Sequence, residues 1–269
     1  MTNKLKCINE YGRLKKVIVC SPNFLSKVNN AKASIDMALK QHHHFVSTLK
    51  EYGVDVIELA PLQQFPEQVF TRDIGFLIGE KAFVSKMANF LRLGEENHFR
   101  QWLEETGSSY TSINVGSIEG GDVIVHENTV YVGLSNRTNK EGVQYLQNLL
   151  PDYKVCEVPF TDAYLHLDCV FNILSPTEAV IFPEEIHGEL VKQLKNRFDL
   201  IEVTKEEQAN LATNVLSIGK KRVISLPINQ SFNKSLKERG YEVIEVDITE
   251  IIKFGGSFRC CTLPILREN

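Results

Sequence analysis

Short apolar runs alternate with amphipathic segments along the whole chain. Residues 14–20, LKKVIVC, form a mostly apolar run that predicts a strand. Residues 34–52 carry apolar side chains at helical spacing and are followed by Gly53, which predicts a helix that ends there. Residues 54–59 return to a strand-like pattern. The first part of the chain is therefore predicted to be strand, helix, strand.

The rest of the chain repeats one pattern, in which two apolar strands are joined by a polar turn. The four full copies lie at 69–86, 118–135, 164–183 and 210–227. A shortened fifth copy, GGSFRCCTLPILRE, lies at 255–268. A helix and a short strand are expected between copies, for example a helix at 185–196 and a strand at 200–203 after the third, and a helix near 93–106 after the first.

One polar residue or cysteine opens the apolar half of each copy. These residues are Asp73, Asp122, Asp168, Asn214 and Cys260, at intervals of 49, 46, 46 and 46. A period of about 40–50 residues that holds one supersecondary unit indicates a closed repeat array. We therefore predict a ring of five strand–turn–strand–helix–strand units that the strand at 14–20 completes, so that exposed sheet edges are removed. The alternative is an ordinary doubly wound sheet with polar strand ends.

A closed ring would direct the polar residues at the head of each copy toward the central axis. The residues expected to share one pocket are Asp73, Glu119, Asp122, His166, Asp168 and Cys260. Asp122 follows two glycines, and it also fits a structural role in capping the turn. Cys260 and Cys261 lie in a strand-like run, where neighbouring side chains face opposite sides, so one thiol would face the site and the other the core.

Composition narrows the functional classes. The chain has 269 residues, 43% of them hydrophobic, which suffices for one domain spanning 1–269. A net charge of -4 argues against a nucleic-acid binder, and no apolar run reaches membrane-spanning length. The six cysteines lack metal-finger spacing and disulfide-rich density, which favours a reduced, cytoplasmic protein. His42, His43 and His44 are consecutive on the predicted helix and are interpreted as mostly solvated, because they cannot converge on one metal ion.

The predicted pocket suits a cationic substrate. Carboxylates at Asp73, Glu119 and Asp168 would select a cation, and a planar guanidinium fits paired carboxylates because it offers forked N–H donors. A bound cation also favours the thiolate form of Cys260. His166 can act first as an acid and then as a base.

The motifs at these positions resemble those of the guanidino-group-modifying enzymes, which include dimethylarginine dimethylaminohydrolases, arginine deiminases and arginine amidinotransferases. The motifs, in order, are GRLKKVIV (12–19), FTRD (70–73), EGGD (119–122), SNRTN (135–139), HLD (166–168) and GGSFRCCTLP (255–264). The resemblance covers nearly the whole chain. It implies a five-bladed α/β propeller, the pentein fold, with pseudo-fivefold symmetry of ββαβ units. The short length, without an added helical domain, is most like the dimethylarginine dimethylaminohydrolase branch.

The resemblance also implies a mechanism. Cys260, rather than Cys261, would attack the guanidinium carbon and carry a covalent thiouronium adduct. His166 would protonate the leaving amine and then activate water, which would release citrulline together with ammonia or a methylamine. Glu119 would hold the guanidinium nitrogens or orient His166, and Asp168 is the other candidate for that orientation. Neither a metal nor an organic cofactor is implied.

Four residues are expected to bind the substrate. Asp73 would clamp the guanidinium group, and Arg137 would bind the α-carboxylate, with Arg92 as a second carboxylate ligand. Asp168 is an acid at a position where many dimethylarginine hydrolases have none, whereas arginine deiminases and amidinotransferases carry one. A carboxylate there favours unsubstituted N–H donors, hence arginine or a monosubstituted guanidine. The alternative interpretation is that Asp168 has only a structural role, in an ion pair with Arg259.

Three functions stay open on the sequence alone. The first is hydrolysis of arginine or methylated arginine, and the second is transfer of the amidino group to an acceptor amine. The third is a propeller without catalytic activity that serves as a binding module. The expected partner is a small guanidine, with no nucleic acid or membrane, and the sequence leaves a homodimer open.

Overall fold

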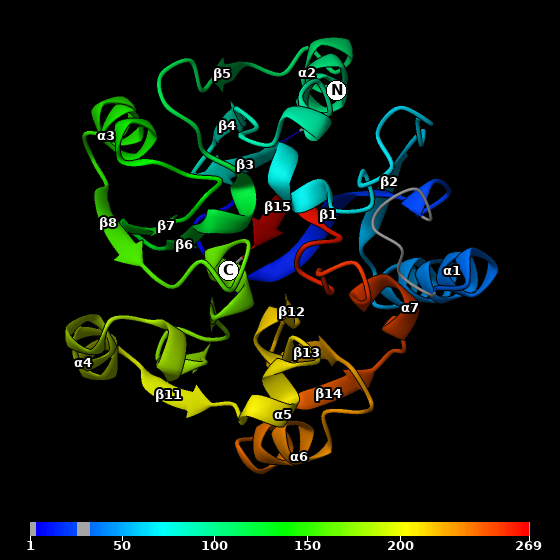
Figure 1. The fold of residues 1–269 in the computed structure, drawn as a ribbon, viewed down its shortest axis with the longest axis vertical. Helices are drawn as coiled ribbons and strands as arrows, with labels where there is room; N and C mark the ends of the chain where they lie inside the picture. Colours follow the sequence, from blue (N-terminus) through cyan, green and yellow to red (C-terminus); the bar gives the residue numbers. More distant parts are fainter. Residues whose placement is uncertain (1–3, 26–32, 269) are drawn as a thin grey trace.

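The chain forms a ring of five small sheets. The computed structural model describes residues 4–25 and 33–268. Within them, five three-stranded sheets surround one centre, and Figure 1 shows the ring end-on, with the helices on its outer side. Each of the four full copies contributes an antiparallel hairpin, and a third strand pairs in parallel with the second strand of that hairpin. The predicted ring of five repeated units is confirmed.

The four full units have the same order of elements. The first unit contains β3 (Gly75–Ile78), β4 (Lys81–Val84), α2 (Glu96–Glu105) and β5 (Tyr110–Ser112). The second contains β6 (Val123–His126), β7 (Thr129–Leu134), α3 (Lys140–Leu149) and β8 (Lys154–Pro159). The third contains β9 (Phe171–Ile173), β10 (Glu178–Ile181), α4 (Gly188–Arg197) and β11 (Asp199–Glu202). The fourth contains β12 (Leu216–Gly219), β13 (Arg222–Ser225), α6 (Gln230–Glu238) and β14 (Glu242–Glu245).

The fifth unit joins the two ends of the chain. Its strands and helix are β15 (Leu263–Glu268), β1 (Arg13–Cys20), α1 (Ile35–Glu51) and β2 (Asp55–Leu59). β1 is the central strand, antiparallel to β15 and parallel to β2, and Ile18 lies opposite both Leu263 and Ile57. The prediction that the first strand completes the last unit is confirmed.

Helix α1 shows how the sequence pattern fixes one of these elements. The Ser34 hydroxyl accepts a hydrogen bond from the backbone N–H of Met37 and so caps the first turn. The buried side chains repeat every three or four residues at Ala38, His42, Phe45 and Leu49, which turns one face toward the core. The interpretation of His42 as solvated is wrong, because it lies on this face and is 2% exposed, and burial lowers its pKa to about 4.

The residues that open the apolar halves lie in tight turns before the strands. Four of these turns are short 3-10 helices: η2 (Thr71–Ile74), η4 (Gly120–Asp122), η5 (Leu167–Cys169) and η7 (Ala212–Asn214). In the fifth unit, residues 258–261 form a turn and the strand starts only at Leu263. The expectation that Cys260 and Cys261 lie on a strand is therefore wrong. The Cys261 N–H bonds to the nearby Ser257 carbonyl instead of a neighbouring strand.

The connections hold several further short helices. These are α5 (Lys205–Gln208), α7 (Thr249–Ile252), η3 (Phe90–Arg92) and η6 (Pro183–Glu185). Helix α4 starts at Gly188, later than predicted, because the chain forms η6 and then an isolated bridge between Ile186 and Phe160. Of the helices in the described part of the chain, none is long and apolar enough to span a bilayer.

Candidate active site

The five turns meet at the centre of the ring and are joined by hydrogen bonds. The backbone N–H of Arg72 donates to the Cys260 carbonyl at 3.0 Å. The Cys260 N–H donates to Oδ1 of Asn214 at 3.1 Å, and Nδ2 of Asn214 donates to the Asp168 carbonyl at 3.1 Å. Oδ1 of Asp122 accepts from the Leu167 N–H at 2.8 Å. Side chains from different units are thus held in fixed positions relative to one another.

His166 precedes η5 and lies between two carboxylates. Its Nε2 is 2.8 Å from Oε2 of Glu119, and its Nδ1 is 3.6 Å from Oδ1 of Asp73. Burial alone would lower the pKa of this imidazole, but the charge of Asp73 and the hydrogen bond to Glu119 raise it well above its ordinary value. These two carboxylates therefore favour the protonated form of His166. Of the two carboxylates that the sequence offered to orient His166, Glu119 contacts the ring, at 2.8 Å.

Glu119, directly before η4, is a buried anion with several donors. Its Oε1 accepts from the backbone N–H of Ala88 at 2.9 Å and lies 3.6 Å from Nη1 of Arg137. Burial opposes its ionisation, yet the hydrogen bond and charge of His166, with help from nearby arginines, lower its pKa to about 2. Arg137 keeps 15% of its side chain exposed, so it lies between this buried group and solvent.

Asp73 forms an ion pair with Arg92. Nη1 of Arg92 is 2.6 Å from Oδ2 of Asp73, while its Nε and Nη2 both donate to Oε2 of Glu95, at 3.0 and 2.7 Å. All three side chains are buried. The guanidinium group of Arg92 is therefore already bonded to Asp73 and Glu95 inside the protein. The expected contact with a substrate carboxylate would require these bonds to break. Oδ1 of Asp73 has no hydrogen-bond partner among the described residues and faces His166.

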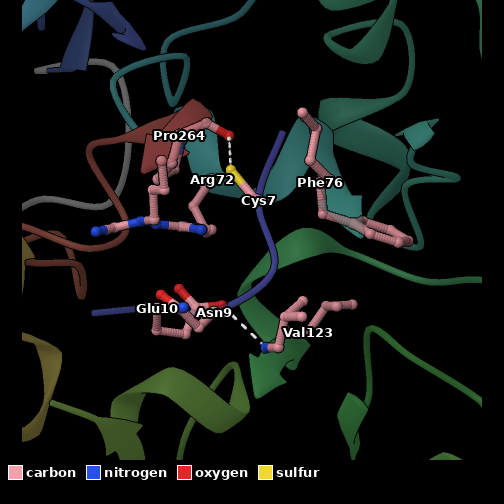
Figure 2. A pocket seen from close by; sticks show the side chains of 10 residues that line it. Cys7, Asn9, Glu10, Arg72, Phe76, Val123 and Pro264 are labelled. Carbon is pink, nitrogen blue, oxygen red and sulfur yellow. Dashed lines mark hydrogen bonds between the residues drawn. The ribbon is translucent and has the colours of Figure 1, made fainter. Parts of the chain in front are cut away.

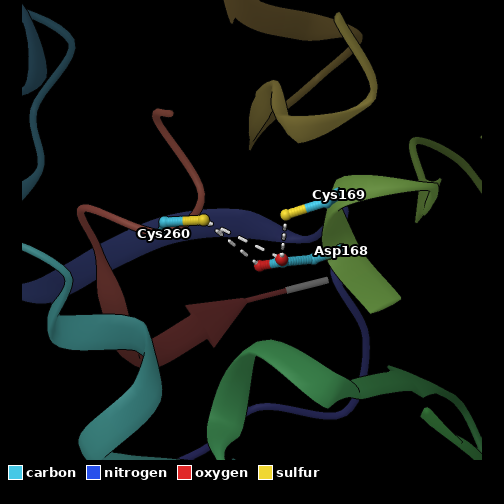
Figure 3. A group of neighbouring side chains, drawn as sticks. All are labelled: Asp168, Cys169 and Cys260. Carbon is cyan, nitrogen blue, oxygen red and sulfur yellow. Dashed lines mark hydrogen bonds between the residues drawn. The ribbon is translucent and has the colours of Figure 1, made fainter. Parts of the chain in front are cut away.

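Asp168 lies beside the Cys260 thiol. Its Oδ1 is 3.8 Å from Sγ of Cys260 and 3.7 Å from Sγ of Cys169, and Figure 3 shows both thiols directed at this carboxylate. Oδ2 of Asp168 is 3.3 Å from Nε of Arg259, so the ion pair with Arg259 is present. Burial raises the pKa of Asp168, although Arg259 opposes that shift.

Arg259 also links this cluster to two residues that line a small chamber. Its Nη1 forms an ion pair with Glu10, and its Nη2 donates to the Val123 carbonyl at 3.0 Å. The chamber has a volume of about 10 Å³, and Figure 2 shows Cys7, Glu10 and Arg72 around it. Burial would raise the pKa of Glu10, but Arg259 and Arg72 lower it to about 2. Arg259, Glu10 and Arg72 therefore form a buried network of charges next to the candidate site.

Three residues at this centre were not selected as site residues from the sequence. Asn214 had been aligned with Cys260 by the repeat spacing, and this signal would have placed it at the site. The sequence indicated Arg259 only as a structural partner of Asp168, and it gave no reason to single out Cys169. Asp122 is used as a hydrogen-bond acceptor between units, at Leu167 and at the Ser135 hydroxyl, which matches its structural reading.

Two groups of side chains have the composition and spacing of metal ligands. The ligand atoms of Asp73, Glu119 and His166 lie within 4.8 Å of one another, as do those of Asp168, Cys169 and Cys260. In the first group, the two carboxylates favour the protonated form of the imidazole. A protonated imidazole has no lone pair to offer a metal, so this group suits proton transfer better.

Comparison with known proteins places the chain among relatives of the same architecture. Residues 20–267 match the family described as N,N dimethylarginine dimethylhydrolase, eukaryotic. The uncharacterized protein YkgA of Bacillus subtilis is 46% identical over 275 residues, which cover 98% of this chain and 96% of that protein. The N(G),N(G)-dimethylarginine dimethylaminohydrolase of Mycobacterium tuberculosis is 26% identical over 239 residues, 87% of this chain and 78% of that protein.

Solved structures agree on the fold. SxtG, an amidinotransferase of Microseira wollei in the saxitoxin biosynthetic pathway, superposes with a TM-score of 0.86 at 23% identity, over 99% of this chain and 98% of that one. The N-terminal domain of ArgZ, a cyanobacterial arginine dihydrolase, superposes with a TM-score of 0.86 at 24% identity, over 94% of this chain and 97% of that one. At these identities the likeness concerns the fold, a five-unit propeller.

Proposed function

Because the chain belongs to the N,N dimethylarginine dimethylhydrolase family, we propose that it is a cysteine hydrolase acting on the guanidinium group of arginine or an N-methylated arginine. The observation that carries the proposal is the buried cluster at the ring centre, where an imidazole–carboxylate pair and a thiol–carboxylate pair come together. Carboxylates bind a guanidinium through its N–H groups, and a thiol can attack its carbon. The reaction class is therefore C–N bond hydrolysis through a covalent intermediate.

The first half-reaction forms the adduct. The Cys260 thiolate attacks the guanidinium carbon, and the bond from that carbon to one terminal nitrogen breaks. The proton for the leaving amine comes from Nδ1 of His166, because Nε2 is engaged with Glu119 at 2.8 Å whereas Nδ1 has only a longer contact, 3.6 Å, with Asp73. Ammonia or a methylamine departs, and a thiouronium group remains on Cys260.

The second half-reaction uses water. His166, now neutral, takes a proton from a water molecule that attacks the thiouronium carbon. The carbon–sulfur bond breaks, the Cys260 thiolate is restored, the remaining proton of the attacking water passes to solvent, and a ureido product of the citrulline type is released. Arg137, at the partly exposed side of the cluster, binds the α-carboxylate of the substrate. Arg92 positions Asp73 through the ion pair between them.

We further propose that arginine is preferred over dimethylarginine. Oδ1 of Asp168 lies 3.8 Å from the Cys260 sulfur, so it faces the nitrogens of a guanidinium whose carbon is under attack. Two methyl groups on one nitrogen would remove the N–H donors that this carboxylate needs and would leave a buried acceptor unpaired.

The test is a substrate screen on the purified protein. Arginine, monomethylarginine, dimethylarginine and agmatine are incubated with it, and citrulline-type ureas and amines are measured. We expect turnover of at least one of these, with a loss of about a thousandfold or more in Cys260→Ser and retained turnover in Cys156→Ser, whose thiol lies on β8. Full turnover by Cys260→Ser would end the proposal.

Amidino transfer is the second candidate, because the thiol, the imidazole and the carboxylates of the cluster are buried and a site that excludes water protects the adduct from hydrolysis. Adding glycine or lysine to the assay separates the two outcomes, since transfer yields a new guanidine in place of a urea. A protein that turns over no guanidine and whose Cys260 resists a haloacetamidine would instead be a binding module.

A further inference from the structure

Cys169 places a second thiol next to the one at Cys260. The two sulfurs and the nearer oxygen of Asp168 all lie within 4.8 Å of one another, and both thiols approach the same Oδ1, at 3.7 and 3.8 Å (Figure 3). Both cysteines are buried and both are free. The reaction proposed above uses only one of them, so Cys169 has no part in it.

The two thiols are held in this arrangement by the units that carry them. The amide of Asn214 bonds to the Cys260 N–H through Oδ1 and to the Asp168 carbonyl through Nδ2, so one side chain bridges the two turns. The Cys169 carbonyl accepts a bond from Nε2 of Gln208 at 2.6 Å and another from the Thr213 hydroxyl. Both turns are thus anchored, with the two sulfurs within 4.8 Å of each other.

We propose that Cys169 and Cys260 form a reversible disulfide when a hydroperoxide reaches the site, with Cys169 as the resolving thiol. A disulfide requires the sulfurs to approach to about 2.05 Å. Cys261, the sequence neighbour of Cys260, is a poorer partner because adjacent cysteines form strained bridges. The pair is therefore a modification site that the hydrolytic reaction does not require.

The chemistry balances with hydrogen peroxide as the oxidant. The Cys260 thiolate attacks one peroxide oxygen, the O–O bond breaks, and the released hydroxide takes the thiol proton to give water and a sulfenic acid on Cys260. Sγ of Cys169 then attacks the Cys260 sulfur, the S–O bond breaks, and the departing hydroxide takes the Cys169 proton as a second water. The two sulfurs are oxidised and the two peroxide oxygens are reduced.

The order of the two thiols follows from their surroundings. The hydrogen bond with Cys260, together with burial, raises the pKa of Cys169 well above its usual value, so Cys169 is a poor first nucleophile toward peroxide. Cys260 reacts first, and Cys169 acts only once a sulfenic acid lies beside it. Without Cys169, the sulfenic acid would be open to further oxidation to the sulfinic acid, which thiol reductants do not reverse.

The first experiment maps the cross-link in the wild-type protein. The reduced protein is treated with hydrogen peroxide, free thiols are alkylated, and the protein is digested without reductant by trypsin and a Glu-specific protease. Cleavage after Glu157 separates Cys156 from Cys169, and fragment spectra separate Cys260 from Cys261. We expect a Cys169–Cys260 peptide that lacks two hydrogens and disappears on treatment with dithiothreitol. Sulfinic acid on Cys260 without that peptide, or a bridge to another cysteine, would overturn the proposal.

The second experiment measures reversibility. Alkylation of Cys260 by iodoacetamide is followed after peroxide treatment and then dithiothreitol. We expect full recovery of labelling in the wild type and in Cys156→Ser, and loss of that recovery in both Cys169→Ser and Cys169→Ala, with sulfinic acid accumulating on Cys260. Equal recovery with and without Cys169 would contradict the assignment. Because the readouts are peptide mass and labelling, a protein that fails to hydrolyse guanidines would leave this test intact.

Discussion

At the scale of single residues, the protonation of His166 decides when the site can work. The imidazolium is needed to protonate the leaving amine, and its pKa is raised by Asp73 and Glu119 despite burial. A group with a raised pKa keeps its proton until the pH rises through that value. Activity should therefore be present at neutral pH and should fall on the alkaline side.

Replacing Glu119 tests this directly. Glu119→Gln keeps a hydrogen-bond acceptor near Nε2 but removes the charge, so the pKa of His166 should fall. We expect the alkaline limb of the kcat profile to move to lower pH and kcat to drop by about a hundredfold or more. The control is Glu189→Gln, which removes an exposed partner of Lys192. An alkaline limb in the same place would mean that another group supplies the proton.

Asp168 is expected to set the choice between substrates. In Asp168→Asn, the side chain still pairs with N–H donors but no longer requires a full set of them. We expect the ratio of kcat/KM for arginine to that for dimethylarginine to fall by about tenfold. Asp152→Asn, on an exposed turn, should leave the ratio unchanged. A ratio that stays constant in Asp168→Asn would assign selectivity to another group.

The sequence named most of these residues but not their contacts. Even spacing was enough to bring Asp73, Asp168 and Cys260 to one centre, because residues at equivalent positions of a ring face the same axis. The spacing did not indicate that the guanidinium group of Arg92 would form ion pairs with Asp73 and Glu95. Ion pairs depend on side-chain directions, which periodicity does not encode. The catalytic and binding roles of all these residues stay predictions.

At the scale of elements, the turns before the strands were the main misreading. Residues such as Ile74 and Cys261 belong to apolar runs that continue into the strands, so the pattern gave no sign of where the turn ended. These 3-10 turns are three or four residues long, which is shorter than the window from which a period can be read. The longer elements, such as β1 and α1, were predicted within a few residues.

Gly121 in η4 shows how closely these turns approach one another. A Cβ at this position would lie 2.6 Å from Cγ of His166 and 2.9 Å from Oδ1 of Asp73. Gly121→Ala should therefore displace the imidazole and lower kcat by about a hundredfold, because small displacements of a catalytic group are costly. Gly188→Ala is the matched control, since its Cβ would meet nothing within 4 Å. Wild-type kcat in Gly121→Ala would show that the imidazole tolerates the shift.

At the scale of the whole molecule, the pair of Glu10 and Arg259 ties the first residues of the ring to its last turn. In Arg259→Met, Glu10 and Asp168 lose their buried partner, and we expect a loss of about 3–5 kcal/mol in unfolding free energy. Arg222→Met, which breaks an exposed pair with Glu242 at 2.7 Å, should cost about 1 kcal/mol or less. Urea unfolding at neutral pH measures both, and equal losses would contradict the role of the buried pair.

The ion pair of Glu10 and Arg259 also predicts that the free energy of unfolding depends on pH. The pKa of Glu10 is lowered from 4.5 to about 2, so its contribution to stability is complete above pH 4.5 and is lost as the pH falls toward 2. In Arg259→Met, the pKa of Glu10 would lie higher than in the wild type because its ion-pair partner is gone, and acidification would neutralise a charge that is less well paired. The stability difference between wild type and variant should therefore shrink in acid, and a difference that stays constant with pH would exclude Glu10 as its source.

The pairing of β1 with β15 has a consequence for how the protein is made. While the chain is being synthesised, β1 can pair with β2 early, but its other edge stays open until residues 263–268 have left the ribosome. Until then an apolar strand edge is available to chaperones, proteases or other unfinished chains. A nascent chain that stalls before residues 263–268 should be degraded or aggregate. Once these residues are made, β15 pairs with β1 and covers the open edge.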